Sequence, residues 1–138
     1  MCDKEKNNIE SCECLHDILE TIIRLQRRDN PKCSAMGCDK PYLGPEQNFI
    51  CYNTRPISLF NCFTGEMWSF PYTVNGSTGT STVFRVESLD DCCCTCRILY
   101  QTVENGVTTY NPTSDFVTIN LDCVSAIKCY ADTFIDLC

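Results

Sequence analysis

The sequence predicts a mainly β protein: an antiparallel β-sandwich or barrel-like domain that carries one N-terminal amphipathic α-helix. Near the N-terminus, apolar residues recur with a helical period of about 3.6 residues, and from about residue 47 the period changes to about two. Turn signals then separate short alternating segments, as they do in all-β domains. The 138 residues suit one core, so we expect a single domain over 1–138, with its β region at about 47–123.

The sequence SCECLHDILETIIRLQRR predicts an amphipathic helix over about 11–28. Its apolar side chains recur at spacings of three and four residues, which places them on one helix face. Ser11 can cap the first turn, and the Asp29-Asn30-Pro31 sequence ends the pattern. The apolar stripe consists of Leu15, Ile18, Leu19, Ile22 and Ile23.

Short strands are expected after residue 47, because polar and apolar side chains alternate there. The clearest hairpin turns at Asn105-Gly106, a pair that favours the type I′ turn. The segment NGSTGT, residues 75–80, is interpreted as a loop because small and polar residues fill it. The expected strands are 49–52, 56–60, 66–70, 82–87, 93–103, 107–110 and 115–123.

Fourteen cysteines stand out in the composition, and four of them crowd the sequence DDCCCTCRILY that begins at Asp90. If this segment is a strand, Cys92, Cys94 and Cys96 share one face and Cys93 lies on the other. Adjacent cysteines pair only in a strained ring, so we expect bonds to distant cysteines or to other chains.

A zinc-stabilised, cysteine-rich binding module is the alternative interpretation of the thiols. Structural zinc sites usually contain two pairs of ligands, with about two to four residues between the members of a pair. A redox site of the Cys-x-x-Cys type finds no βαβ context here. A few cysteines, such as Cys51 and Cys62, are expected to be small buried apolar residues. The zinc set that fits loosely is Cys33 and Cys38 with Cys92 and Cys94, or with Cys93 and Cys96.

Charge and motifs argue against several classes of function. The net charge of −7 disfavours nucleic acid as a partner, because phosphates would be repelled. No apolar run is long enough to span a membrane, and the N-terminal residues lack the apolar core of a secretory signal, so we expect synthesis in a reducing cytoplasm. His16 is the only histidine and no catalytic motif is present, so we expect neither an enzyme nor a cofactor.

Several sequence blocks, in this order, resemble the bacterial spore coat protein Y/Z family, which includes exosporium members. Together the blocks span most of the chain, and it is the ordered set that carries the resemblance. They are Leu25-Gln26 at the helix end, CSAMGCDKPYLG from Cys33, NTRPISLF from Asn53, VFRVESLDD from Val83 and NLDCVSAIKC from Asn120.

The resemblance implies a structural protein that assembles with copies of itself, in hexameric rings of a two-dimensional lattice, and with other spore coat proteins. It implies synthesis in the mother-cell cytoplasm without a signal peptide, and a final place in the outer coat or exosporium. Thiols would stay reduced during assembly and form cross-links later, so we expect non-covalent assembly to precede disulfide formation.

On this interpretation the cysteines divide into two groups. Those near the chain ends and in the dense cluster are candidates for bonds between chains, because mobile ends reach neighbours with little strain. The candidates for bonds between chains are Cys2, Cys12, Cys14, Cys92, Cys93, Cys94, Cys96 and Cys138. The candidates for bonds within one chain are Cys33, Cys38, Cys123 and Cys129.

Overall fold

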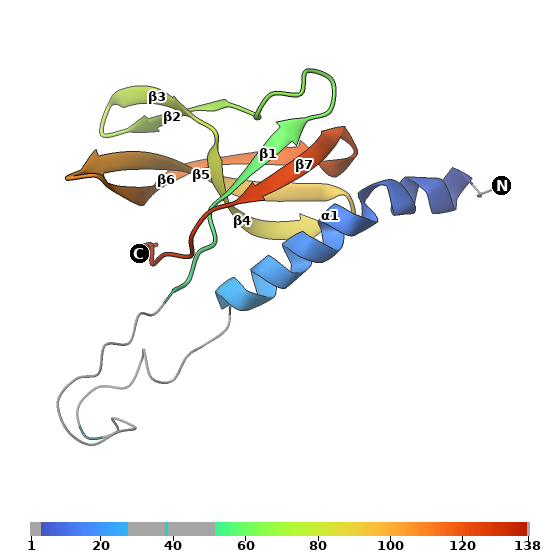
Figure 1. Cartoon of the computed structure of the whole chain (residues 1–138), viewed down its shortest axis with the longest axis horizontal. Coiled ribbons are helices and arrows are strands. Elements are labelled where there is room, and N and C mark those ends of the chain that lie inside the picture. The colour runs from blue at the N-terminus through green and yellow to red at the C-terminus, as the bar shows by residue number, and fades with distance from the viewer. Residues whose placement is uncertain (1–3, 28–37, 39–51, 138) are drawn as a thin grey trace.

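A computed structural model describes residues 4–27, 38 and 52–137 of the chain (Figure 1). One N-terminal helix, α1, lies against a five-stranded antiparallel sheet, and a two-stranded hairpin lies over the same sheet. The expectation of a mainly β protein with antiparallel sheets and one N-terminal helix is therefore confirmed. The predictions for Cys2, Cys33, Cys51 and Cys138 fall outside the described residues.

Helix α1 spans Lys4–Arg27, so it begins earlier than the expected residue 11. The added first turns are polar, and an amphipathic pattern finds only the part of a helix that has a buried face. From Cys12 onward the helix packs against the sheet of the same chain. Gln26 donates its side-chain amide to the carbonyl of Val86 at 2.8 Å, and Arg27 donates to the carbonyl of Glu87 at 3.0 Å.

The main sheet has the strand order β6-β5-β4-β1-β7, and all of its described pairings are antiparallel. The order leaves β6 and β7 as edge strands, which explains how β6 accommodates Pro112, a residue without a backbone donor. The strands are β1 (Ile57–Asn61), β4 (Val83–Asp90), β5 (Cys93–Glu104), β6 (Val107–Asn120) and β7 (Val124–Cys129).

The predicted hairpin at Asn105-Gly106 is confirmed, with φ of 52° and 78° at the two turn residues. The loop expected at 75–80 is wrong: β2 (Phe70–Val74) turns at Asn75-Gly76 and returns as β3 (Ser77–Ser81). Asn75 and Gly76 have φ of 51° and 80°, so the same turn chemistry operates at both hairpins.

The β region also extends beyond its expected end at residue 123. A 3-10 turn, η2 (Leu121–Cys123), leads into β7, which pairs with β1 over five residue pairs. Thr133 then bridges to Thr54, which holds the C-terminal segment beside the start of the sheet. The last strand of the sheet, β7, therefore lacks a clear alternation of polar and apolar residues.

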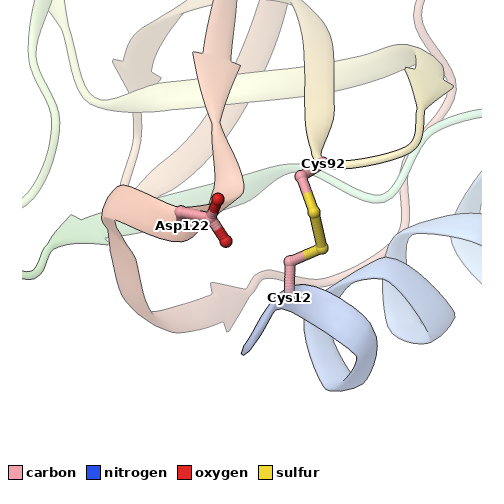
Figure 2. Close-up of side chains that lie close together, drawn as sticks. All are labelled: Cys12, Cys92 and Asp122. Carbon is pink, nitrogen blue, oxygen red and sulfur yellow. A yellow bond between two sulfur atoms is a disulfide. The ribbon is translucent and has the colours of Figure 1, made fainter. Parts of the chain in front are cut away.

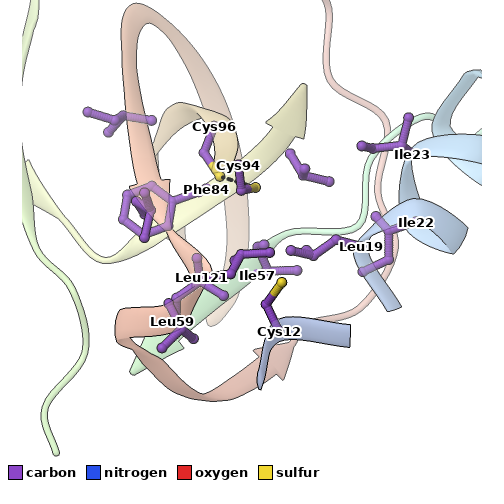
Figure 3. Close-up of a cluster of buried hydrophobic side chains, with 14 residues drawn as sticks. Cys12, Leu19, Ile22, Ile23, Ile57, Leu59, Phe84, Cys94, Cys96 and Leu121 are labelled. Carbon is purple, nitrogen blue, oxygen red and sulfur yellow. Dashed lines mark hydrogen bonds between the residues drawn. The ribbon is translucent and has the colours of Figure 1, made fainter. Parts of the chain in front are cut away.

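The main core lies between one face of the sheet and its two covers, α1 and the β2–β3 hairpin. Strand register places Phe84, Val86, Cys94, Cys96 and Ile98 on this face, and all five are buried. Figure 3 shows the apolar side of α1 meeting the same cluster. The helix contributes Cys12, Leu19, Ile22 and Ile23.

Aromatic stacking attaches the hairpin to this face of the sheet. Phe70 meets the edge of Phe84, with ring centroids 5.8 Å apart, and stacks on Trp68 at the same distance. Tyr72 stacks on Tyr100 with centroids 5.5 Å apart. Such pairs add about 0.5–1.5 kcal/mol each beyond the area they bury.

The opposite face of the sheet carries charge as well as apolar residues. Val83 and Leu99 form a small buried cluster with Ile135 of the C-terminal segment. Beside it, Arg85 and Arg97 both contact the carboxylate of Glu87, at 2.6 and 3.3 Å. The C-terminal segment after β7 therefore covers part of this second face.

Candidate functional site: the thiols

A disulfide between Cys12 and Cys92 joins helix α1 to the turn between β4 and β5 (Figure 2). Their Cα atoms lie 6.0 Å apart, inside the range of about 4.4–6.8 Å that native bridges use. The two residues are 80 positions apart in the sequence, so the bond closes a large loop. It fastens the N-terminal half of the helix to the sheet.

Local backbone structure holds Cys92 in place. The turn passes through Asp91 in the left-handed region, with φ of 50°, which Asp tolerates better than most residues. The backbone N–H of Leu121 then donates to the carbonyl of Cys92 at 2.7 Å. Cys92 is thus anchored between the β4–β5 turn and η2, opposite the buried Cys12.

The sequence analysis set down Cys12 and Cys92 as candidates for bonds between chains, whereas the structure joins them within one chain. The physical reason is the position of Cys12. It lies eight residues inside the helix that begins at Lys4, and its side chain is only 3% exposed. Cys12 was expected at the start of the helix, near a mobile chain end, and the helix instead begins two turns earlier and buries it.

A carboxylate lies beside this disulfide. One oxygen of Asp122 and the sulfur atoms of Cys12 and Cys92 all lie within 4.8 Å of one another. Figure 2 shows the Asp122 side chain directed toward the pair. The three residues share a pocket with His16, which lies one helical turn beyond Cys12.

Cys94 and Cys96 form a second, different environment. Both are fully buried on the core face of β5, with sulfur atoms 3.4 Å apart. The hydrogen bond to Cys94, together with burial, raises the pKa of the Cys96 thiol well above its usual value. Both were candidates for bonds between chains, but reaching a neighbour would require the core to open.

Besides Cys38, four thiols of the described residues are exposed and unbonded in different parts of the surface. Cys62 was expected to be buried, and the structure instead exposes it in the turn after β1. Cys93 is exposed because it faces away from Cys94 on β5, as strand alternation predicts. The other two are Cys14 on α1 and Cys129 at the end of β7, where partial burial raises the pKa of the thiol.

Cys123 and Cys129, both expected in bonds within the chain, cannot bond to each other in this fold. They flank β7, and six residues of extended strand span about 20 Å. Cys38, also expected in an internal bond, is exposed, and its expected partner Cys33 lies outside the described residues.

Both zinc sets suggested by the sequence include Cys33, which lies outside the described residues, but the set with Cys93 and Cys96 is excluded on other grounds. Cys93 and Cys96 point to opposite faces of β5, so one ion cannot bind both. Within the described part of the chain, the only group of acidic, histidine or cysteine side chains close enough for one metal ion is Cys12, Cys92 and Asp122. No sequence spacing could reveal this set, because its members come from α1, a turn and η2.

No helix among residues 4–27 and 52–137 is long and apolar enough to cross a membrane.

The family model of spore coat protein Z matches residues 1–132. No curated protein and no solved structure matches the chain. The match confirms the resemblance to the Y/Z group and covers nearly the whole sequence, so it supports a structural role in the spore coat. The chain belongs to the spore coat protein Z family.

Proposed function

We propose that this protein is a self-assembling, non-enzymatic subunit of the outer coat or exosporium, and that disulfides between subunits lock its lattice. Its main partner is a second copy of itself, arranged in hexameric rings, together with other spore coat proteins. The observation that carries the proposal is the distribution of free thiols. Exposed cysteines occur on the helix, on a turn, on β5 and at the end of β7, so bonds can form in several directions.

The structure separates thiols that can serve this role from thiols that cannot. Cys12 and Cys92 already satisfy each other, and Cys94 and Cys96 are enclosed in the core. A disulfide forms only when Cα atoms approach within about 7 Å, which a buried residue cannot achieve with another chain. The exposed cysteines are therefore the proposed source of cross-links among the described residues: Cys14, Cys38, Cys62, Cys93 and Cys129.

Register between subunits must come from non-covalent contacts before oxidation. Trp68, Phe70 and Tyr72 contact aromatic rings of the same chain, so they are less suited to this contact. Better candidates are exposed apolar side chains, because they gain most from burial against a neighbour. They are Phe63, Val103, Val107 and Phe134, which are 81%, 66%, 63% and 60% exposed.

The open edges of β6 and β7 offer a second means of association. Unpaired backbone groups on an edge strand can pair with a strand of another chain. Val103 and Val107 lie on the protruding β5–β6 hairpin beside its turn, so an apolar contact there can accompany edge pairing. A heterologous contact of this kind closes into a ring when its rotation allows.

The test is assembly from a mixture of unlabelled and ¹⁵N-labelled protein, first in reductant and then after oxidation. Electron microscopy should show rings or sheets in reductant that dissolve in hot detergent, and oxidation should make them resist it. Non-reducing peptide mapping should then find mixed-isotope pairs at the exposed cysteines, whereas Cys12–Cys92 should carry one isotope only. Protein that stays monomeric in reductant at every concentration, or mixed-isotope bonds at Cys94 and Cys96, would overturn the proposal.

A further inference from the structure

Cys12, Cys92 and Asp122 combine two soft ligands with one hard ligand at a single point. Zinc binds thiolate, imidazole and carboxylate groups, usually four in a tetrahedral arrangement. The three ligand atoms lie within 4.8 Å of one another, a spacing that one ion can bridge. His16 lines the same pocket but is not one of the close group, so solvent would take the remaining position.

We propose that, before the disulfide forms, Cys12, Cys92 and Asp122 bind one divalent ion of the zinc class. The ion takes the place of the disulfide, since the same two sulfur atoms cannot serve both. Each thiolate would lie about 2.3 Å from the zinc, so the sulfurs separate from bonding distance. Because the Cα atoms are 6.0 Å apart, side-chain rotation suffices and the backbone can stay in place.

The ion would link Cys12 and Cys92 during the period before their disulfide can form. Before any oxidant reaches the protein, a metal bridge between the same residues would add to the core packing and hydrogen bonds that hold helix α1 on the sheet. Bound thiolates are also withheld from the exposed cysteines of neighbouring chains. Zinc at this point would therefore keep Cys12 and Cys92 reserved for each other among the chain's fourteen thiols.

The change from ion to disulfide can be balanced with a peroxide as oxidant. The two zinc-bound thiolates give up two electrons and form the S–S bond. Hydrogen peroxide accepts these electrons with two protons and becomes two molecules of water, and Zn²⁺ leaves. One ion is released for each Cys12–Cys92 bond formed, so the exchange can be counted.

The first experiment uses Co²⁺ as a spectroscopic probe on full-length protein in a phosphine reductant, followed by displacement with Zn²⁺. Thiolate–cobalt charge-transfer absorption should appear at one equivalent. Cys12→Ser and Asp122→Asn should each weaken binding at this equivalent by more than about tenfold. The matched controls, Cys14→Ser on the exposed side of α1 and Asp91→Asn in the same pocket, should bind like the wild type. Equal losses in test and control variants, or none in the test variants, would overturn the proposal.

The second experiment needs no substitution, so misfolding of a variant cannot obscure it. Reduced protein is alkylated with and without Zn²⁺, and each cysteine is followed by peptide mass spectrometry. Zinc should slow the alkylation of Cys12 and Cys92 at least about tenfold and leave Cys14 unchanged. Equal rates at Cys12 and Cys92 with and without zinc would contradict the site. This result is independent of lattice assembly, so it separates failure of the metal site from failure of the proposed function.

Discussion

The sulfur atoms of Cys94 and Cys96 lie 3.4 Å apart inside the core, while Cys93, the residue just before Cys94, faces solvent. Strand β5 therefore presents chemically different thiols on its two faces. On the inner face the pair behaves as small apolar residues packed among Phe84, Val86 and Ile98. A dense run of cysteines in this sequence thus contains both core residues and surface residues.

This arrangement predicts a large difference in reactivity within the cluster. In reduced native protein, Cys93 should be alkylated quickly, and Cys94 and Cys96 at least about a hundred times more slowly, because the reagent reaches only the exposed thiol unless the core opens. Peptide mass spectrometry over a time course measures the three rates. In denaturant the rates should become equal. Fast labelling of Cys94 in the native protein would show that this face of β5 is open.

Alkaline pH should destabilise the reduced protein through the same pair. The pKa of Cys96 is raised in the folded state, first by its hydrogen bond with Cys94 and then by burial, so the unfolded chain loses this proton at lower pH. The contribution of Cys96 is fully present below about pH 8.5, the usual thiol pKa, and falls above it. One thiol changes the free energy of unfolding by at most about 1.4 kcal/mol per pH unit.

Urea titrations in reductant at several pH values between about 7.5 and 10 measure this dependence. Cys96→Ala should flatten the slope, whereas Cys93→Ala, an exposed thiol on the same strand, should leave it unchanged. Cys129, whose pKa is also raised, adds a smaller change of the same sign. Equal slopes for wild type and Cys96→Ala would contradict this cause.

Sequence patterns could predict the helix face, the change to β structure and the Asn105-Gly106 hairpin, because each depends on local chemistry. They missed β3, although Asn75-Gly76 carries the same turn signal as Asn105-Gly106. The polar residues that follow it suggested a loop, whereas tertiary contacts such as the stack of Tyr72 on Tyr100 and the contact of Phe70 with Phe84 hold this strand pair against the sheet. Strand β7 was not predicted, because an edge strand that pairs on one side needs little alternation of polar and apolar residues.

The thiol sites were less predictable than the fold. Alternation on β5 does divide Cys93 from Cys94 and Cys96, and the structure bears that division out. The sequence could not predict the disulfide partner of Cys92. That partner depends on how α1 packs on the sheet, and hydrophobic periodicity carries no information about this packing. Asp122 belongs to a one-turn 3-10 helix whose position follows from its contacts with the β4–β5 turn.

Glu87 should be important for stability, because its carboxylate is shared by two guanidinium groups. Arg85 is 7% exposed and also donates to Thr54 at 2.9 Å, and Arg97 donates to the carbonyl of Thr113 at 2.8 Å. Glu87→Gln keeps the volume and removes the charge, leaving the two cations largely buried without a counterion. We expect the free energy of unfolding to fall by about 2–3 kcal/mol.

Chemical denaturation of Glu87→Gln and of Glu104→Gln tests this expectation. Glu104 is exposed at the end of β5, so its substitution should cost less than about 0.5 kcal/mol. The double variant Glu87→Gln, Arg85→Met should recover part of the loss, because it removes one of the unpaired charges. A Glu87→Gln protein as stable as the Glu104→Gln control would mean that solvent compensates the two arginines.

Removal of the Cys12–Cys92 bond should loosen α1 from the sheet. The bond closes a loop of 80 residues, for which chain entropy alone gives about 4.5 kcal/mol, and measured losses for native bridges are about 2–5 kcal/mol. The variant Cys12→Ser, Cys92→Ser should therefore unfold at lower denaturant than the oxidised wild type. In native-state hydrogen exchange, the amides of α1 should lose more protection than those of β4 and β5. The contacts that remain to the helix are its apolar residues in the core and three hydrogen bonds of Gln26 and Arg27 at its end. Cys14→Ser on the exposed face of α1 is the matched control and should change neither measurement. Equal protection losses throughout the sheet would show that the bond stabilises the whole domain and not the attachment of the helix.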